Sequence, residues 1–191
     1  MSTASSNHSH HDDSLAGLVL RDTGESVARC YQCGKCAAGC PLAADMDRAP
    51  SQVLRLLQLR QRGFDDQALR SLSIWLCLTC ETCHARCPQS VDLPRIMDTL
   101  RRESLRRRLV HPRARDIVAF HRSFLDTVRH TGRLHEVGLI AAFKARSRRL
   151  FQDVGLAPKL FLRGKLSPWP HRIRGRAEVA RLFEKANPAK D

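Results

Sequence analysis

Apolar residues recur at helical spacing through most of this chain, and strand-like alternation is almost absent. The pattern predicts helices over residues 50–62, 65–76, 94–108, 114–130, 134–151 and 176–185. Glycines end two of them, at Gly63 and Gly132, and His111-Pro112 separates two others. Shorter pieces follow at 158–162 and in the turn 167–170. The sequence therefore predicts an all-α fold.

The N-terminal part gives weaker signals. Residues 1–14 are mostly Ser, His and Asp without an apolar period, which predicts a disordered tail. A short apolar piece, Leu15 to Leu20, comes next. We expect Asp22 or Thr23 to cap a helical turn that leads into the first cysteine.

Two copies of one cysteine pattern, C-x2-C-x2-C-x3-C-P, use all eight cysteines of the protein. The first run spans residues 30–41 and the second spans residues 77–88. This is the bacterial ferredoxin spacing for cubane [4Fe-4S] clusters, in which the fourth cysteine of each run binds the other run's cluster. The sequence therefore predicts two [4Fe-4S] clusters as cofactors. The predicted iron ligands of one cluster are Cys30, Cys33, Cys36 and Cys87, and those of the other are Cys77, Cys80, Cys83 and Cys40.

Two other uses of the cysteines compete with clusters. Disulfides fit poorly, because no signal peptide is expected and cysteines two residues apart are awkward partners. Zinc is the stronger alternative, since paired C-x2-C motifs also bind zinc. Zinc gives no reason for a third cysteine two residues on, or for a terminal Cys-Pro that occurs twice.

Several residues near the cysteines are candidates for tuning the clusters. Gly34 and Gly39 are expected to let backbone approach a cluster and to offer N–H groups to its sulfurs. Trp75 and Leu76 are expected to pack around the second cluster and exclude water. His84 could hydrogen-bond a sulfide or be an inert, partly exposed histidine.

Charge divides the chain in two. Residues 1–100 hold 10 Lys or Arg against 11 Asp or Glu, whereas residues 101–191 hold 23 against 8. The predicted organisation is a tail at 1–14, a two-cluster domain at 15–110 and a basic helical region at 111–191. No apolar run is long enough for a transmembrane helix. Thiolate ligands and the absent leader predict a cytoplasmic protein, and peripheral membrane association stays open.

The runs and the helical spacer between them resemble the α-helical ferredoxin domain of iron–sulfur subunits in flavin-dependent dehydrogenases and heterodisulfide reductase. Three further segments resemble the C subunit of heterodisulfide reductase, with a lean towards the sulfur-oxidising type of complex. They are Ile74-Trp-Leu-Cys77, the stretch 131–138 and the stretch 164–175. The resemblance covers roughly residues 20–186.

The resemblance implies an electron-transfer subunit of an oxidoreductase complex, without catalytic residues of its own. Its expected partners are a flavin-containing A subunit and a B subunit with catalytic CCG motifs, in thiol/disulfide or sulfur metabolism. The alternatives are an iron–sulfur subunit of another flavin-dependent dehydrogenase, or a basic protein that binds nucleic acid. Nucleic acid is not expected as a partner, because zinc-finger spacing is missing and the few aromatic residues sit at core spacing.

Overall fold

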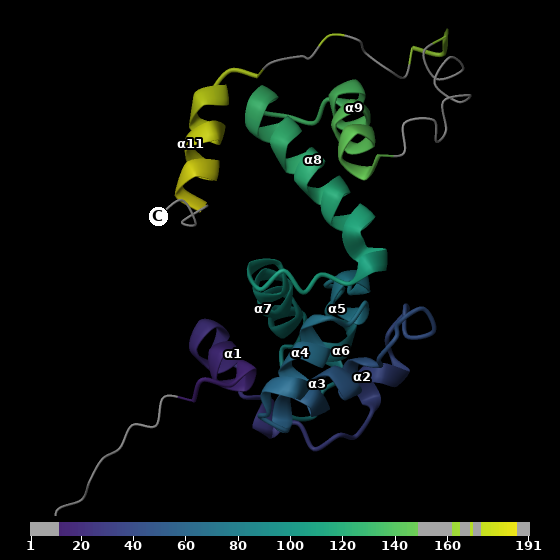
Figure 1. The fold of residues 1–191 in the computed structure, drawn as a ribbon, viewed down its shortest axis with the longest axis vertical. Coiled ribbons are helices and arrows are strands. Elements are labelled where there is room, and N and C mark those ends of the chain that lie inside the picture. The colour runs from purple at the N-terminus through teal and green to yellow at the C-terminus, as the bar shows by residue number, and fades with distance from the viewer. Residues whose placement is uncertain (1–11, 149–161, 165–168, 170–172, 187–191) are drawn as a thin grey trace, which may run out of the picture. The chain divides into compact units, whose positions relative to one another are not determined.

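A computed structural model describes residues 12–148, 162–164, 169 and 173–186. Within these residues the regular elements are helices and no strand occurs, which confirms the all-α prediction (Figure 1). The chain forms two compact units, residues 1–114 and 115–191. The division follows residue 114, four residues after position 110, where the predicted two-cluster domain ends, and the functional meaning of the two parts stays a prediction.

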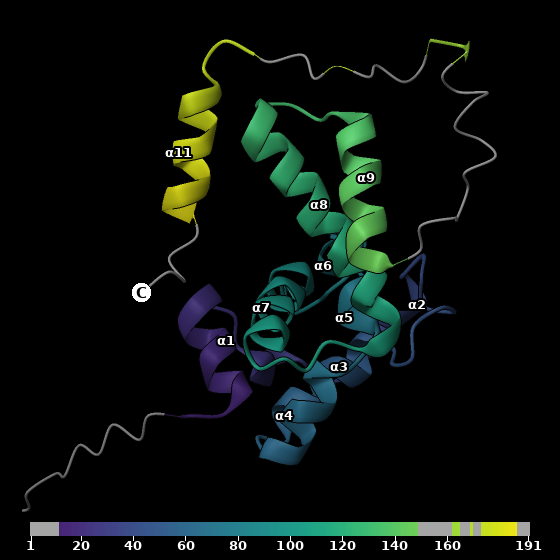
Figure 2. The ribbon, with the colours of Figure 1, turned by 45° about the horizontal axis from the view of Figure 1, so that its top comes forward.

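The first unit is built around α7 (Leu93–Arg106). This helix contacts α1, α4, α5 and α6, and α2 contacts both α3 and α6 (Figure 2). Leu57, Leu69, Ile96 and Leu100 are fully buried in the resulting core. The other elements of the unit are α1 (Leu15–Thr23), η1 (Val27–Arg29), α2 (Lys35–Ala38), α3 (Pro50–Gln58), α4 (Arg62–Leu69), α5 (Ser73–Leu76), α6 (Thr82–Ala85) and η2 (Pro112–Ala114).

The short apolar piece at 15–20 forms helix α1, and the predicted helical turn before Cys30 is η1, whose N-cap is Ser26. The N-cap of α1 is Ser14, whose hydroxyl accepts the Gly17 N–H at 3.2 Å, and Gly24 ends this helix with a left-handed φ of 75°. The expected cap at Asp22 or Thr23 is wrong, because these residues lie at the end of α1. Of the predicted tail, residues 1–11 lie outside the described residues, while Asp12 pairs with Arg60 at 2.7 Å.

The segment between the cysteine runs is divided differently from the prediction. Helix α3 ends at Gln58, and Gly63 lies in the first turn of α4 rather than ending a helix. The predicted helix over 65–76 is split into α4 and α5. The split occurs where the Asp47 carboxylate accepts hydrogen bonds from Ser71 and Ser73, a contact that replaces the continuing helical pattern.

The second unit contains α8 (Arg115–Thr131), α9 (Glu136–Ser147) and α11 (Arg176–Ala186), close to the predicted positions. Both α9 and α11 contact α8. The end of the predicted helix at 149–151, the piece at 158–161 and most of the turn at 167–170 lie outside the described residues. Among the described helices, none is sufficiently long and apolar to span a membrane.

Candidate functional site

The two cysteine runs have the same local backbone. In each run a four-residue helix, α2 or α6, carries the third cysteine, and a residue in the left-handed region precedes it. That residue is Gly34 (φ 76°) in the first run and Glu81 (φ 61°) in the second. Gln32 (φ 63°) and Thr79 (φ 51°) also match. Each run therefore forms the same tight loop, which turns its first three cysteines towards one side.

The first cavity is lined by three cysteines of the first run and by the last cysteine of the second run. Its polar neighbours are Lys35 and Ser51, and apolar side chains of Leu54, Val91 and Leu93 complete the wall. The cysteines in its lining are Cys30, Cys33, Cys36 and Cys87, together with Cys83. The structure thus brings together the four residues that the crossed pattern predicts for one cluster.

The second cavity is lined by Cys40 from the first run and by Cys77, Cys80 and Cys83 from the second. Its wall is more apolar than that of the first cavity, and it includes Met46, Leu76 and Met97 among other apolar side chains. Leu76 therefore lies where the sequence predicted. Trp75 does not line this cavity, although it is buried at 7% exposure.

All eight cysteines are free, so the disulfide alternative is wrong. Burial raises the pKa of the Cys36 and Cys77 thiols, and it raises that of Cys83 to about 12. Thiols of this kind do not ionise alone at neutral pH, and a bound metal that displaces the proton makes them thiolates. Four converging cysteines per cavity, half-buried or at the surface, fit an iron–sulfur cluster better than an isolated nucleophile.

Polar side chains outside the runs hold the cysteine loops in place. Arg101 of α7 donates to the backbone oxygens of Ile74, at 2.5 Å, and of Cys77. Gln58 of α3 donates to the backbone oxygens of Val27, at 2.9 Å, and of Cys30, at 2.6 Å. Sequence reasoning missed both, because a single Arg or Gln on a helix has no periodic pattern that distinguishes it from a solvated residue.

Asp47 ties the loop after Cys40 to the helix before Cys77. Its Oδ1 accepts hydrogen bonds from Ser71 Oγ (2.8 Å), Ser73 Oγ (2.7 Å) and Ser73 N (2.9 Å). Partial burial opposes ionisation, but these hydrogen bonds outweigh it and lower the Asp47 pKa to about 2. An ionised carboxylate thus fixes two segments that lead to cysteines of the same cavity.

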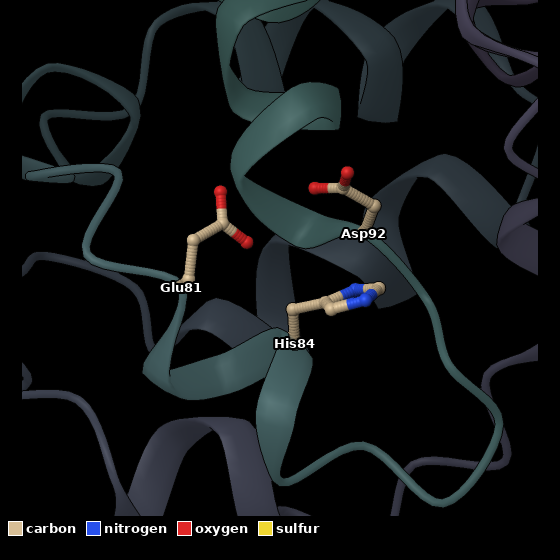
Figure 3. A group of neighbouring side chains, drawn as sticks. All are labelled: Glu81, His84 and Asp92. Atoms are coloured by element: carbon tan, nitrogen blue, oxygen red, sulfur yellow. The ribbon is translucent and has the colours of Figure 1, made fainter.

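His84 lies beside carboxylates of Glu81 and Asp92, with one ligating atom of each within 4.8 Å of the others (Figure 3). Its Nδ1 is buried and has no hydrogen-bond partner among the described residues. Asp92 already accepts the Arg95 N–H at 3.0 Å as the N-cap of α7. The three side chains come together because Glu81 and His84 belong to the N-cap and the body of α6, and α6 contacts α7, whose N-cap is Asp92.

The expectation for Gly39 is wrong. Its N–H donates to the Lys35 oxygen at 3.1 Å and so continues the turn of α2 rather than pointing at a sulfur. A Cβ at this position would lie 2.4 Å from Arg86 Nη1. The Arg86 side chain of the second run packs against the backbone here, so a larger residue at position 39 would displace that side chain.

Comparisons with known proteins agree with this geometry. Residues 26–91 match the family of the 4Fe-4S dicluster domain. The chain is 36% identical over 52 residues to the iron-sulfur C subunit of CoB--CoM heterodisulfide reductase from Methanopyrus kandleri, covering 27% of this chain and 26% of that protein. It is 28% identical over 66 residues to the C subunit of H(2):CoB-CoM heterodisulfide,ferredoxin reductase from Methanothermobacter thermautotrophicus, covering 35% and 34%. The matched part of the chain thus spans about a third or less of the length of these curated relatives.

Proposed function

We propose that this chain is an electron-transfer subunit of a heterodisulfide-reductase-like complex, because residues 26–91 match a 4Fe-4S dicluster domain, which implies two [4Fe-4S] clusters. The observation that carries the proposal is the pair of adjoining cavities, each with cysteines from both runs. We assign one cluster to Cys30, Cys33, Cys36 and Cys87, and the other to Cys40, Cys77, Cys80 and Cys83.

Each cluster, when bound, supplies reversible one-electron transfer. The protein contributes placement and insulation. Cys83 lines both cavities, so the two ligand sets are close together, which supports a relay. Cys33 and Cys80 are exposed and the other six cysteines are partly exposed, so each ligand set lies near the surface. Met46, Leu76 and Met97 limit water at the second site.

In the proposed complex this chain passes electrons between a flavin-containing A subunit and a CCG-type catalytic B subunit, in thiol/disulfide or sulfur metabolism. The similarity to the C subunits of heterodisulfide reductases supports this role. The sequence has no CCG motif and no cysteine beyond the eight assigned ones, so the proposed substrate chemistry takes place on a partner.

The second unit offers a surface for such a partner. On α8 the buried side chains are Ser123 and Thr127, whereas Phe124, Leu125 and Phe120 (43% exposed) are exposed. One side of the Phe120 ring packs edge-on against Phe143 of α9, with ring centroids 5.9 Å apart. Arg122 on the same helix makes no ion pair with any described residue. An exposed apolar face with basic neighbours is typical of a protein–protein interface with an acidic rim.

The arginine cluster at 101–108 fits a structural role better than nucleic-acid binding. Arg101 holds backbone oxygens, Arg102 pairs with Asp22 at 3.0 Å, and both Arg106 and Arg107 pair with Glu103. Carboxylates beside these guanidinium groups reduce the positive charge that they offer to a phosphate backbone.

The first test is iron, acid-labile sulfide and EPR on protein purified without oxygen and reduced with dithionite. About eight irons per chain, with spectra of two interacting reduced cubanes, are expected. Zinc with little sulfide would refute the assignment.

The partner role needs a separate test. The chain is co-expressed with candidate flavin and CCG subunits, and the double variant Phe120→Ser/Phe124→Ser is compared with Leu20→Ser, which changes an exposed leucine of α1. We expect only the α8 variant to lose co-purification while keeping its iron. Equal retention of both variants would refute docking on α8.

A further inference from the structure

Gln32 lies inside the first cysteine run, and its amide faces a proposed cluster ligand. Its Nε2 donates to Cys30 Sγ at 3.5 Å and to Gln58 Oε1 at 3.2 Å. Given the proposed ligand assignment, on which this inference rests, we propose that Gln32 sets the reduction potential of the first cluster through its N–H···S hydrogen bond. Gln32 is then a positioning and tuning residue for electron transfer.

The hydrogen-bond network fixes which end of each amide faces which partner. Two backbone oxygens, those of Val27 and Cys30, lie at 2.9 and 2.6 Å from Gln58 Nε2 and need a donor. Gln58 must therefore point its NH2 group at them, which leaves its Oε1 towards Gln32. Gln32 in turn must present its own NH2 group, and the second hydrogen of that group points at the Cys30 sulfur.

This network uses all four amide hydrogens of the two glutamines. Exchanging the amide oxygen and nitrogen of either side chain by rotation would therefore lose hydrogen bonds. The Gln58 side chain comes from α3, a helix with a well-buried apolar face. The donor on Gln32 is thus held by the core of the unit and not only by its own loop. A fixed donor of this kind is available before an electron arrives.

The second run provides an internal comparison. Thr79 occupies the same loop position as Gln32 and shares its left-handed backbone, with φ of 51° against 63°. Its hydroxyl donates to the Leu78 oxygen at 2.7 Å and not to a cysteine sulfur. The two loops therefore share a backbone but differ in their side-chain contacts to sulfur: Gln32 donates to Cys30 in the first run, whereas in the second the Thr82 hydroxyl lies 3.4 Å from Cys80 Sγ.

The direction of the effect follows from charge. Reduction adds one electron and no bond breaks, and the added negative charge is spread partly over the ligand sulfurs. A hydrogen bond to a sulfur stabilises the more negative state more, so it raises the potential. Loss of the Gln32 donor should therefore make the first cluster harder to reduce and leave the second cluster unchanged.

The test is an EPR-monitored redox titration of the full chain, reduced stepwise with dithionite. Gln32→Met keeps the side-chain length and removes the donor, and Gln32→Glu replaces the donor by an acceptor. Thr79→Val is the matched control in the second run. In both Gln32 variants one of the two reduction steps should move to lower potential, by up to about tenfold in equilibrium constant, or about 59 mV for one electron.

Iron content separates the possible results. Two unmoved steps in Gln32 variants that hold two clusters would overturn the proposal, and so would an equal shift in Thr79→Val. Loss of one cluster in both Gln32 variants would mean a structural role and would also overturn it. If the unmodified protein itself lacks two clusters, the proposed function fails, and with it the basis of this inference.

Discussion

Replacement of Asp47 by alanine tests how the fold holds the second cavity together. The change removes the acceptor shared by Ser71 and Ser73. Both serines are buried, with exposed fractions of 1% and 0%. The Ser73 hydroxyl keeps a second acceptor, the Arg48 oxygen at 2.6 Å. The Ser73 N–H also keeps a second acceptor, Ser71 Oγ at 3.2 Å, so the buried Ser71 hydroxyl is the donor that loses its acceptor.

Each buried donor left without a partner costs about 1–3 kcal/mol. We expect Asp47→Ala to lower the free energy of unfolding by about 1–3 kcal/mol, because it leaves one such donor. Loosening of the segments before Cys77 and after Cys40 should also speed the loss of visible cluster absorption.

The assay is anaerobic urea unfolding followed by circular dichroism, with Asp45→Ala as the control. Asp45 is an exposed neighbour whose carboxylate makes no hydrogen bond with the residues that the structure describes. The unmodified protein should also lose stability as pH falls from 3.8 towards 2, because the carboxylate is favoured in the folded state. If the two variants differ by less than about 1 kcal/mol, the reasoning on buried donors is wrong.

Three further predictions concern ligation, capping and pH. Cys87→Ser should damage mainly the cluster of the first run and Cys40→Ser that of the second, as measured by EPR of each variant; equal loss of both clusters would contradict crossed ligation. Ser14→Ala should lower the free energy of unfolding by about 1 kcal/mol in a urea titration, since it removes the N-cap of α1. Glu103, whose pKa the hydrogen bond from Arg106 lowers, should contribute stability that is lost as pH falls below 4.5, and Glu103→Gln should flatten that loss in thermal melts.

The cysteine grouping could be predicted from sequence because it depends on spacing alone. Two residues between cysteines leave room only for a tight loop, and the proline after Cys40 and Cys87 turns the chain away from it. Long amphipathic helices such as α7 and α8 could also be predicted from sequence, because apolar residues at helical spacing over several turns are incompatible with the alternation of a strand. Whether the grouped cysteines bind as assigned stays a prediction.

The missed features depend on contacts between distant polar residues. The end of α4 is determined by Asp47, which lies 24 positions before Ser71, and no local propensity signals such a contact. Arg101 sits among other arginines, and only its bonds to the Ile74 and Cys77 oxygens distinguish it from them. Polar residues of this kind are recognised only once the fold supplies their partners.

One omission could have been avoided by comparing the two runs position by position. Gly34 is an obvious candidate for a left-handed residue, and Glu81 occupies the same place in the second run. A side chain in that region costs roughly 1–2 kcal/mol relative to glycine, so Glu81 alone gives no reason to expect it. The repeat does, because a loop that must direct three cysteines to one cavity needs the same backbone both times. The shared backbone then leaves side chains such as Gln32 and Thr79 as the means by which two otherwise equal sites can differ.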